Sequence, residues 1–318
     1  MMEQPPGADP QAPLQPDEPP APPPAYAAPP PPAAAGRSGV RTIIIATVLV
    51  AVIVIGLVGY AAVGYAYSQT RISAADRALN TVISHQNKLN DAFKAIDTNF
   101  TSLSTSSSFD PTQAKRVVDQ FVATSQGAGK TIDQDDASLA SAGGGLNDQR
   151  WLTMVSRGNL DHESARVTHA RKALSNARTV AGDYVRDGQF LQAFMNVLID
   201  LDKLDTQATA ADFAGAQTTL GTMKTDAANA VQLSSAPGLP QEMHALMLDM
   251  QTLTSDFGKL LTAAQAGDDA AVTSAEQTLQ GDANKISAYN FDTLGAQIDA
   301  YYKPLVDGFN SEMSAATS

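Results

Sequence analysis

The sequence contains no cysteine among its 318 residues. A chain without cysteine forms no disulfide, offers no thiolate to zinc and has no thiol nucleophile. Only four histidines and six glutamates are present, which leaves few candidates for general acids, general bases and metal ligands. We therefore expect no catalytic, cofactor-binding or metal-binding residue in this chain.

Positive charge is also scarce, because 21 lysines and arginines are set against 33 aspartates and glutamates, a net charge of −12. Proteins that bind nucleic acid need a clustered basic surface to neutralise phosphates, so nucleic acid is excluded as a partner. The acidic excess is concentrated at the C-terminal end. Residues 190–318 carry 5 basic and 16 acidic side chains, whereas residues 146–189 carry 7 basic and 5 acidic ones.

Proline is crowded into one end of the chain, with 14 of the 18 prolines in residues 1–36. Such a segment has almost nothing to bury, and each proline fixes φ and removes a backbone donor. The composition predicts a disordered tail over residues 1–39 that favours the polyproline II conformation.

The next segment has the opposite composition, because residues 43–66 form a run of 24 residues without a single charge. A helix of that length spans about 36 Å, which is enough to cross a hydrocarbon core of about 30 Å. The run exceeds the apolar region of a signal peptide, and a long tail precedes it. The sequence therefore predicts one transmembrane helix within residues 40–67, with the lipid bilayer as partner. A cleaved signal peptide ending near residues 64–66 is the alternative.

The orientation of this helix is not decided by its flanking charges. Arg37 and Arg41 precede it and Arg71 and Arg77 follow it, so the positive-inside rule gives a tie. The lack of cysteine and of cytoplasmic motifs in the long C-terminal part favours an N-terminus inside the cell. We expect a single-pass protein of the cell membrane with a cytoplasmic tail and an extracytoplasmic C-terminal domain.

A helical repeat of apolar residues begins soon after the predicted membrane span. The positions advance by three and four residues in turn, and nine of the ten are apolar: Ile72, Ala75, Leu79, Val82, Gln86, Leu89, Phe93, Ile96, Phe100 and Leu103. This spacing predicts a bundle or coiled-coil seam. The Ile72–Leu103 seam could pair with a second copy to form a homo-oligomer, although packing within the chain is the default because other helices are close by.

Turn signals divide the rest of the chain into further helices. Asp110 and Pro111 form a cap and first-turn pair, and a glycine triplet at residues 143–145 predicts the end of that helix. We expect a third helix from about residue 147 to residue 187, with Gly188 separating it from a fourth. Later breaks are predicted at residues 237–240 and 267–269.

Together these signals predict an all-α fold, in which a single transmembrane helix is followed by an elongated bundle of about seven to eight antiparallel helices built from αα-hairpins. Residues 72–188 form a first helical segment, and residues 189–318 form a second, acidic one. Period-two alternation is not evident in either segment, which disfavours strands.

One short motif resembles a phosphate-binding loop, because Gly127-Ala128-Gly129-Lys130-Thr131 matches the end of the Walker A pattern. Thr124 stands where that pattern requires glycine, and helical rather than strand-forming residues flank the motif. A degenerate P-loop that binds nucleotide remains an alternative function if the domain is cytoplasmic.

The histidines do not match the spacing of a metal site in a helical bundle, which pairs glutamate and histidine three residues apart. His162 and Glu163 are adjacent, whereas Glu242 and His244 are two apart. His162 and His169 share a stripe but lie about 10 Å apart along the helix axis. We expect these histidines, and His85 beside the first seam, to be structural or surface residues.

The layout of tail, anchor and bundle resembles that of single-pass envelope proteins of prokaryotes. Our preferred hypothesis is a non-enzymatic, membrane-anchored protein whose extracytoplasmic bundle is an interaction or spacer module, with another envelope protein as its partner. An alternative is a ligand-sensing module that signals through a partner, because a bundle leading into a membrane helix resembles the sensing halves of chemoreceptors and histidine kinases. Arg150, Trp151 and Arg157 are then the candidate ligand-binding residues.

Overall fold

A computed structural model describes residues 70–105, 109–147 and 157–318 of the chain. All of them belong to one compact unit. The described part contains seven helices and no strand. The helices are α2 (Thr70–Thr105), α3 (Pro111–Asn147), α4 (Arg157–Thr209), α5 (Phe213–Leu233), α6 (Gln241–Ala266), α7 (Asp269–Ser287) and α8 (Phe291–Thr317). The predicted all-α class is therefore confirmed.

The predicted tail and the predicted membrane span, residues 43–66, lie outside the described residues. Within the part that the structure does describe, no helix combines the length and the apolar composition that crossing a bilayer requires.

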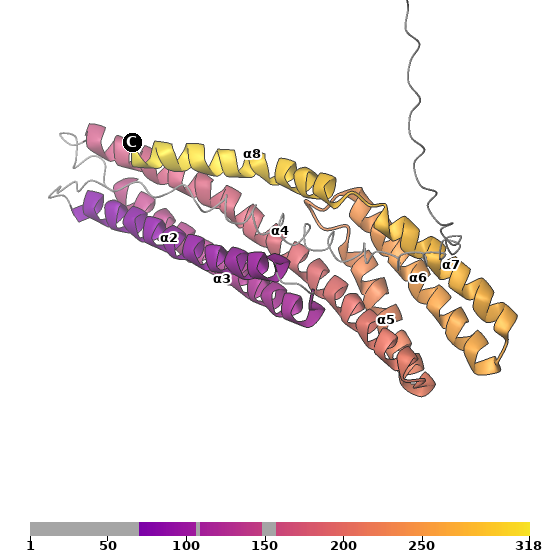
Figure 1. Cartoon of the computed structure of the whole chain (residues 1–318). Helices are drawn as coiled ribbons and strands as arrows, with labels where there is room; N and C mark the ends of the chain where they lie inside the picture. The colour runs from indigo at the N-terminus through magenta and orange to yellow at the C-terminus, as the bar shows by residue number, and fades with distance from the viewer. Residues whose placement is uncertain (1–69, 106–108, 148–156) are drawn as a thin grey trace, which may run out of the picture. The chain divides into compact units, whose positions relative to one another are not determined.

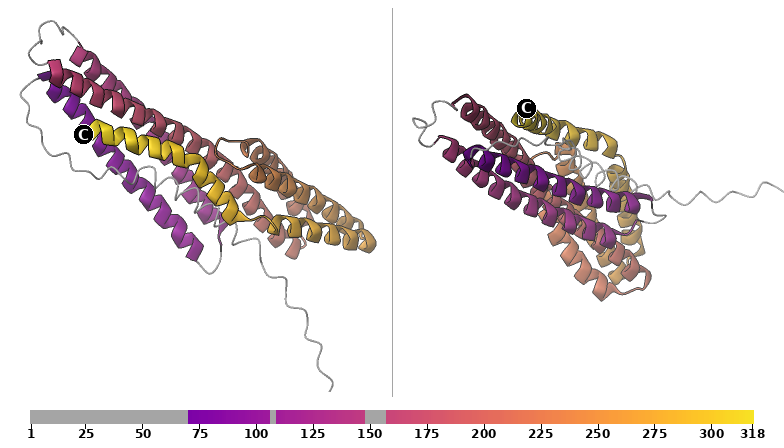
Figure 2. Two further views of the ribbon diagram at one scale, coloured as in Figure 1. Left: turned by 90° about the horizontal axis from the view of Figure 1, so that it is seen from above. Right: turned by 90° about the vertical axis from the view of Figure 1, so that its left-hand side faces the viewer.

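Four helices, α2, α3, the N-terminal part of α4 and the C-terminal helix α8, pack together in one half of the fold. α2 packs on α3, α3 packs on α4, and α8 returns along the N-terminal half of α4 (Figure 1). α4 and α8 run antiparallel, because Arg166 near the start of α4 reaches Ala316 near the end of α8, whereas Asp187 farther along α4 meets Tyr302. The second half consists of the C-terminal part of α4 and of α5, α6 and α7, each packed on its predecessor (Figure 2).

The seam predicted from residue 72 onward is buried in the single chain. Its side chains from Ile72 to Ile96 are less than a tenth exposed, apart from the half-buried Leu89. They pack against α3 and α4, so intrachain neighbours cover the surface that was considered for pairing with a second copy. Burial of such a stripe is the main stabilising term for a helix of this kind.

The structure confirms several of the predicted helix boundaries. The Asp110 carboxylate accepts hydrogen bonds from the backbone amides of Thr112 and Gln113, at 2.8 and 3.1 Å, which caps α3. The segment of residues 237–240 separates α5 from α6, and Gly267 ends α6 in the left-handed conformation, with φ +64°. Asp268 then caps α7 through the amide of Ala271.

The predicted break at Gly188 is wrong, because α4 continues through it over 53 residues, a length of about 80 Å. The glycine instead allows α3 to approach closely. A Cβ atom at position 188 would lie 2.4 Å from Val122 Cγ2 and 3.2 Å from Phe121 Cδ1. Consequently the boundary placed between residues 188 and 189 falls inside one continuous helix that belongs to both halves.

The predicted end of α3 at residues 143–145 is also wrong. α3 continues through the three glycines to Asn147. Gly143 again serves packing, because a Cβ atom there would lie 3.3 Å from Val167 Cγ1 on α4. The third helix was expected to begin near residue 147, but the described part of α4 begins at Arg157.

Candidate functional site

The ligand-binding residues proposed from the sequence cannot be placed in a site. Arg150 and Trp151 lie outside the described residues. Arg157 is the first residue of α4, but the structure describes only its backbone. Their role in ligand binding stays a prediction.

The motif that resembles a phosphate loop forms part of a helix. Residues 127–131 lie in the middle of α3, with Ala128 buried in the core and Lys130 exposed. Inside a helix the backbone amides are already bonded to carbonyls four residues earlier, so they cannot surround a phosphate as a loop does. The residues of this motif thus continue the helix that their flanks predicted and do not form a loop.

Two of the histidines, His85 and His169, each pair with one carboxylate on a neighbouring helix. His85 on α2 lies 2.8 Å from Asp135 Oδ1 on α3, and His169 on α4 lies 2.5 Å from Glu312 Oε2 on α8. His244 Nδ1 lies 2.9 Å from the hydroxyl of Ser234. Among the residues described, no group of three or more histidines, aspartates and glutamates is arranged to hold a metal ion.

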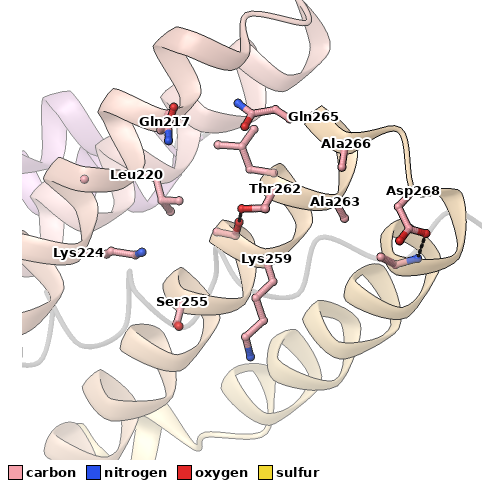
Figure 3. Close-up of a pocket in the computed structure, with 14 residues that line it drawn as sticks. Gln217, Leu220, Lys224, Ser255, Lys259, Thr262, Ala263, Gln265, Ala266 and Asp268 are labelled. Atoms are coloured by element: carbon pink, nitrogen blue, oxygen red, sulfur yellow. Dashed lines mark hydrogen bonds between the residues drawn. The ribbon is translucent and has the colours of Figure 1, made fainter.

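A groove between α5 and α6 has a volume of about 720 Å³ and extends to the start of α7 (Figure 3). α5 contributes Gln217, Leu220, Gly221 and Lys224, and α6 contributes most of the other lining residues. A Cβ atom added at Gly221 would meet nothing within 4 Å, so this wall of the groove is open. The groove is therefore large enough for a small ligand or for a side chain of a partner protein.

Several polar groups in this groove are available to a ligand. Within the described part of the chain, Gln217, Lys224 and Gln265 make no side-chain hydrogen bond or ion pair. Asp268 is the carboxylate among the lining residues, and its oxygen accepts the capping hydrogen bond from Ala271 at 3.0 Å. Ser255 likewise makes no side-chain hydrogen bond in the described part, so the open groups are two amides, one hydroxyl and one ammonium, which favours binding through hydrogen bonds and positive charge.

Lys259 connects the groove to a pair of buried carboxyl groups. Its Nζ lies 2.5 Å from Asp256 Oδ1, and this contact lowers the pKa of Asp256. Burial raises the pKa of Asp282 on α7, and the neighbouring Asp256 carboxylate raises it further. Two carboxyl groups in contact cannot both ionise easily, so Asp282 holds its proton to a higher pH than Asp256, which pairs with Lys259.

Comparison with known proteins gives no relative. Protein-family models, curated proteins and solved structures were all searched, and none matches this chain.

A second polar feature lies in the interior of the fold, where α8 meets α4. The Tyr302 hydroxyl donates a hydrogen bond of 2.6 Å to Asp187 Oδ2, and both side chains are buried. The other oxygen of Asp187 and the hydroxyl of Tyr184 are buried without a hydrogen-bond partner among the described residues. We call Tyr184, Asp187 and Tyr302 the Tyr–Asp cluster. None of the three lines the groove.

Burial controls the ionisation of this cluster. It raises the pKa of Asp187 to about 8, although the Tyr302 hydroxyl partly opposes the shift. Burial and the neighbouring Asp187 also raise the pKa of Tyr184 and of Tyr302. The carboxyl group is therefore mostly neutral at pH 7, because ionising it would leave a poorly compensated charge in the core.

Sequence reasoning missed both the groove and the Tyr–Asp cluster. The groove depends on two glycines, Gly221 and Gly258, that face it from α5 and α6. Asp187 and Tyr302 are separated by 115 positions, so no local pattern marks them as partners. The sequence feature that points to the Tyr–Asp cluster is an acidic residue between aromatic residues on α4, and this pattern is weak on its own.

Proposed function

We propose that this chain is a non-enzymatic, single-pass, membrane-anchored binding module. Residues 43–66 cross the cell membrane, the Pro-rich tail is cytoplasmic, and the helical part is extracytoplasmic. The described residues support the helical part of this proposal, since they form a continuous helical assembly with one core cluster. The position of α2 agrees with an anchor, because this helix begins at Thr70, just after the apolar run.

The observation that carries the binding function is the groove between α5 and α6. Its open groups are two amides, a hydroxyl and an ammonium, and its carboxylate caps α7. Such a set can hold a ligand or a partner side chain in place through hydrogen bonds and charge. The proposed partner is a segment of another envelope protein.

A photo-crosslinking experiment in cells tests this assignment. A benzophenone amino acid replaces Gln217 in the groove, and in a control strain it replaces the exposed Gln120 on α3. We expect a discrete crosslinked product from position 217 but not from position 120. Filling the groove with Gly221→Trp should abolish that product. Equal crosslinking from both positions, or no effect of the filled groove, would reject the groove as the binding site.

The membrane orientation is tested by cysteine labelling, which the absence of native cysteine makes unambiguous. Ala8→Cys marks the tail and Ser318→Cys marks the exposed C-terminus. In intact cells a membrane-impermeant maleimide should label only the cysteine at position 318. Labelling of position 8 alone would place the helical part in the cytoplasm, and labelling of both would reject a single membrane span.

Ligand sensing is a second candidate function, favoured by the packing of α2, α3, α4 and α8. These four helices form an antiparallel group that begins directly after the predicted span, as in a module that passes a signal to a membrane helix. A ligand that binds only the native state raises the melting temperature. A reproducible shift by one metabolite, lost in Gly221→Trp, would favour sensing over protein binding.

A further inference from the structure

Asp187 occupies the junction between the two halves of the fold. It lies on α4, and three other elements meet it or its neighbours: α8 through Tyr302, α3 through Phe121 and Val122 at Gly188, and the α5–α6 connection through Pro237. The Tyr302 hydroxyl is shared, since it lies 2.6 Å from Asp187 Oδ2 and 3.5 Å from the Pro237 carbonyl oxygen. One carboxyl group thus helps to hold two otherwise separate segments on α4.

The charge that Asp187 gains on ionisation has little compensation. On α4 it is accompanied by the carboxylate of Asp183 and the guanidinium of Arg186, but the Arg186 side chain is 61% exposed and lies 3.7 Å from Asp183. α8 presents Tyr301, Tyr302 and Asp299 toward this region. α3 and α2 present the uncharged rings of Phe121 and Phe93, which contact Tyr184.

Two backbone features next to the cluster make this junction able to open. Pro304 lies inside α8, and because proline has no N–H it cannot bond the carbonyl of Ala300. α8 is therefore weakened within two residues of Tyr302. On the opposite side Gly238 has φ +88°, and a Cβ atom there would lie 2.8 Å from the Tyr302 hydroxyl. The hydroxyl is thus seated against a turn that only glycine fits easily.

We propose that Asp187 is a proton-binding latch: the neutral carboxyl group holds α8 and the α5–α6 connection on α4, and loss of its proton releases them. In the closed form the carboxyl group accepts the Tyr302 hydrogen bond with no net charge in the core. In the ionised form the buried carboxylate, beside that of Asp183, draws in water, and the N-terminal part of α8 moves away about the weak point at Pro304. The raised pKa of Asp187, about 8, places this transition within reach of ordinary buffers.

The latch is testable by distance measurements between two spin labels. Cysteines replace the exposed Gln120 on α3 and Ala296 on α8 in the full-length protein, held in detergent micelles, and each carries a nitroxide. Pulsed electron resonance then gives the distribution of label distances at about pH 6.5 and about pH 9.5, on either side of the expected transition. We expect one narrow distribution at the lower pH and a broader, displaced one at the higher pH.

Two variants and one matched control decide the interpretation. Asp187→Asn cannot ionise, so its distribution should stay narrow at both pH values. Asp205→Asn removes an exposed carboxylate from the same helix and should behave like the parent protein. Tyr302→Phe removes the hydrogen bond through which Asp187 holds α8, so its distribution should already be broad at the lower pH. The proposal is overturned if the parent distribution is independent of pH, or if Asp187→Asn broadens as the parent does.

Discussion

The Tyr302 hydroxyl on α8 donates a hydrogen bond of 2.6 Å to Oδ2 of Asp187 on α4, across 115 positions of the sequence. Tyr184 packs against the Tyr302 ring, with ring centroids 4.9 Å apart, and is itself in contact with Phe93 and Phe121. A chain of aromatic rings thus connects α2, α3, α4 and α8 around one buried carboxyl group. This arrangement makes the ionisation of Asp187 a term in the stability of the whole core.

Replacing Asp187 by asparagine should change how stability depends on pH. The unfolded carboxyl group has a pKa near 3.8 and the folded one near 8, so between these values only the unfolded chain loses the proton. The contribution of Asp187 to stability therefore falls as pH rises from about 4 and levels off above about 8. The free energy of unfolding of Asp187→Asn should exceed that of the parent by at least ~2 kcal/mol at pH ~9 and by much less at pH ~4. Each pKa unit corresponds to about 1.4 kcal/mol.

The free energy of unfolding, measured by urea denaturation at a series of pH values, checks this expectation. The exposed carboxylate of Asp205 on the same helix provides the control, and Asp205→Asn should follow the parent curve. Parallel curves for Asp187→Asn and the parent would show that Asp187 is ionised in the native state and that its burial has no such effect.

Replacing two glycines of α4 by alanine should change the stability of the protein in opposite directions. A methyl group at position 188 would be forced against Val122 and Phe121, so Gly188→Ala should lose about 1–3 kcal/mol. Gly182 is exposed, with nothing within 4 Å of an added Cβ atom, so Gly182→Ala should gain about 0.5–1 kcal/mol through helix propensity. Thermal melting followed by circular dichroism distinguishes them, and a loss of similar size in both variants would contradict the packing described for Gly188.

Arg166 should contribute more to stability than an exposed arginine of the same helix. Its guanidinium lies 2.7 Å from Glu163 and 3.1 Å from Asp76 and donates to the Ala316 carbonyl oxygen at 2.9 Å, with the side chain 19% exposed. Arg166→Ala leaves the buried Glu163 carboxylate without its partner, so we expect a loss of at least ~2 kcal/mol.

The control for that change is Arg178→Ala. The Arg178 side chain is 45% exposed, and its closer partner Asp133 is 66% exposed, so solvent screens this pair. A second partner, Asp136, lies farther away, at 3.5 Å, and also pairs with Arg171. We expect a loss below ~1 kcal/mol. Both variants are compared by urea denaturation, and equal losses would mean that the Arg166 cluster joins α2, α4 and α8 no more strongly than a surface pair does.

The cap of α3 offers a local test. Asp110→Ala removes the acceptor for the amides of Thr112 and Gln113 and should cost about 1 kcal/mol. Asp110→Asn keeps a side-chain oxygen at the same place and should cost only a few tenths of a kcal/mol. If the two variants melt at the same temperature, the hydrogen bonds of the cap do not contribute to stability.

The helices themselves could be predicted because their signals are local. A stripe of apolar residues spaced by three and four residues was sufficient for the α2 seam, and all of its described positions from Ile72 to Ile96 lie on the packed face. The same holds for the Asp110 cap and for the Pro237–Pro240 break, since caps and prolines act within a few residues. The sequence failed at Gly188 and at residues 143–145, where the role of glycine depends on a helix that comes from elsewhere.

The sequence by itself determined the all-α class, the order of the helices and the acidic charge of the second half, because periodicity, capping and composition are properties of neighbouring residues. Tertiary structure alone decided that α4 is continuous, that α8 returns to pack on it, and that α5 and α6 leave a groove between them. It also decided that Asp187 meets Tyr302 in the core. Burial and long-range contacts set these features, and neither is encoded in any short stretch of the chain.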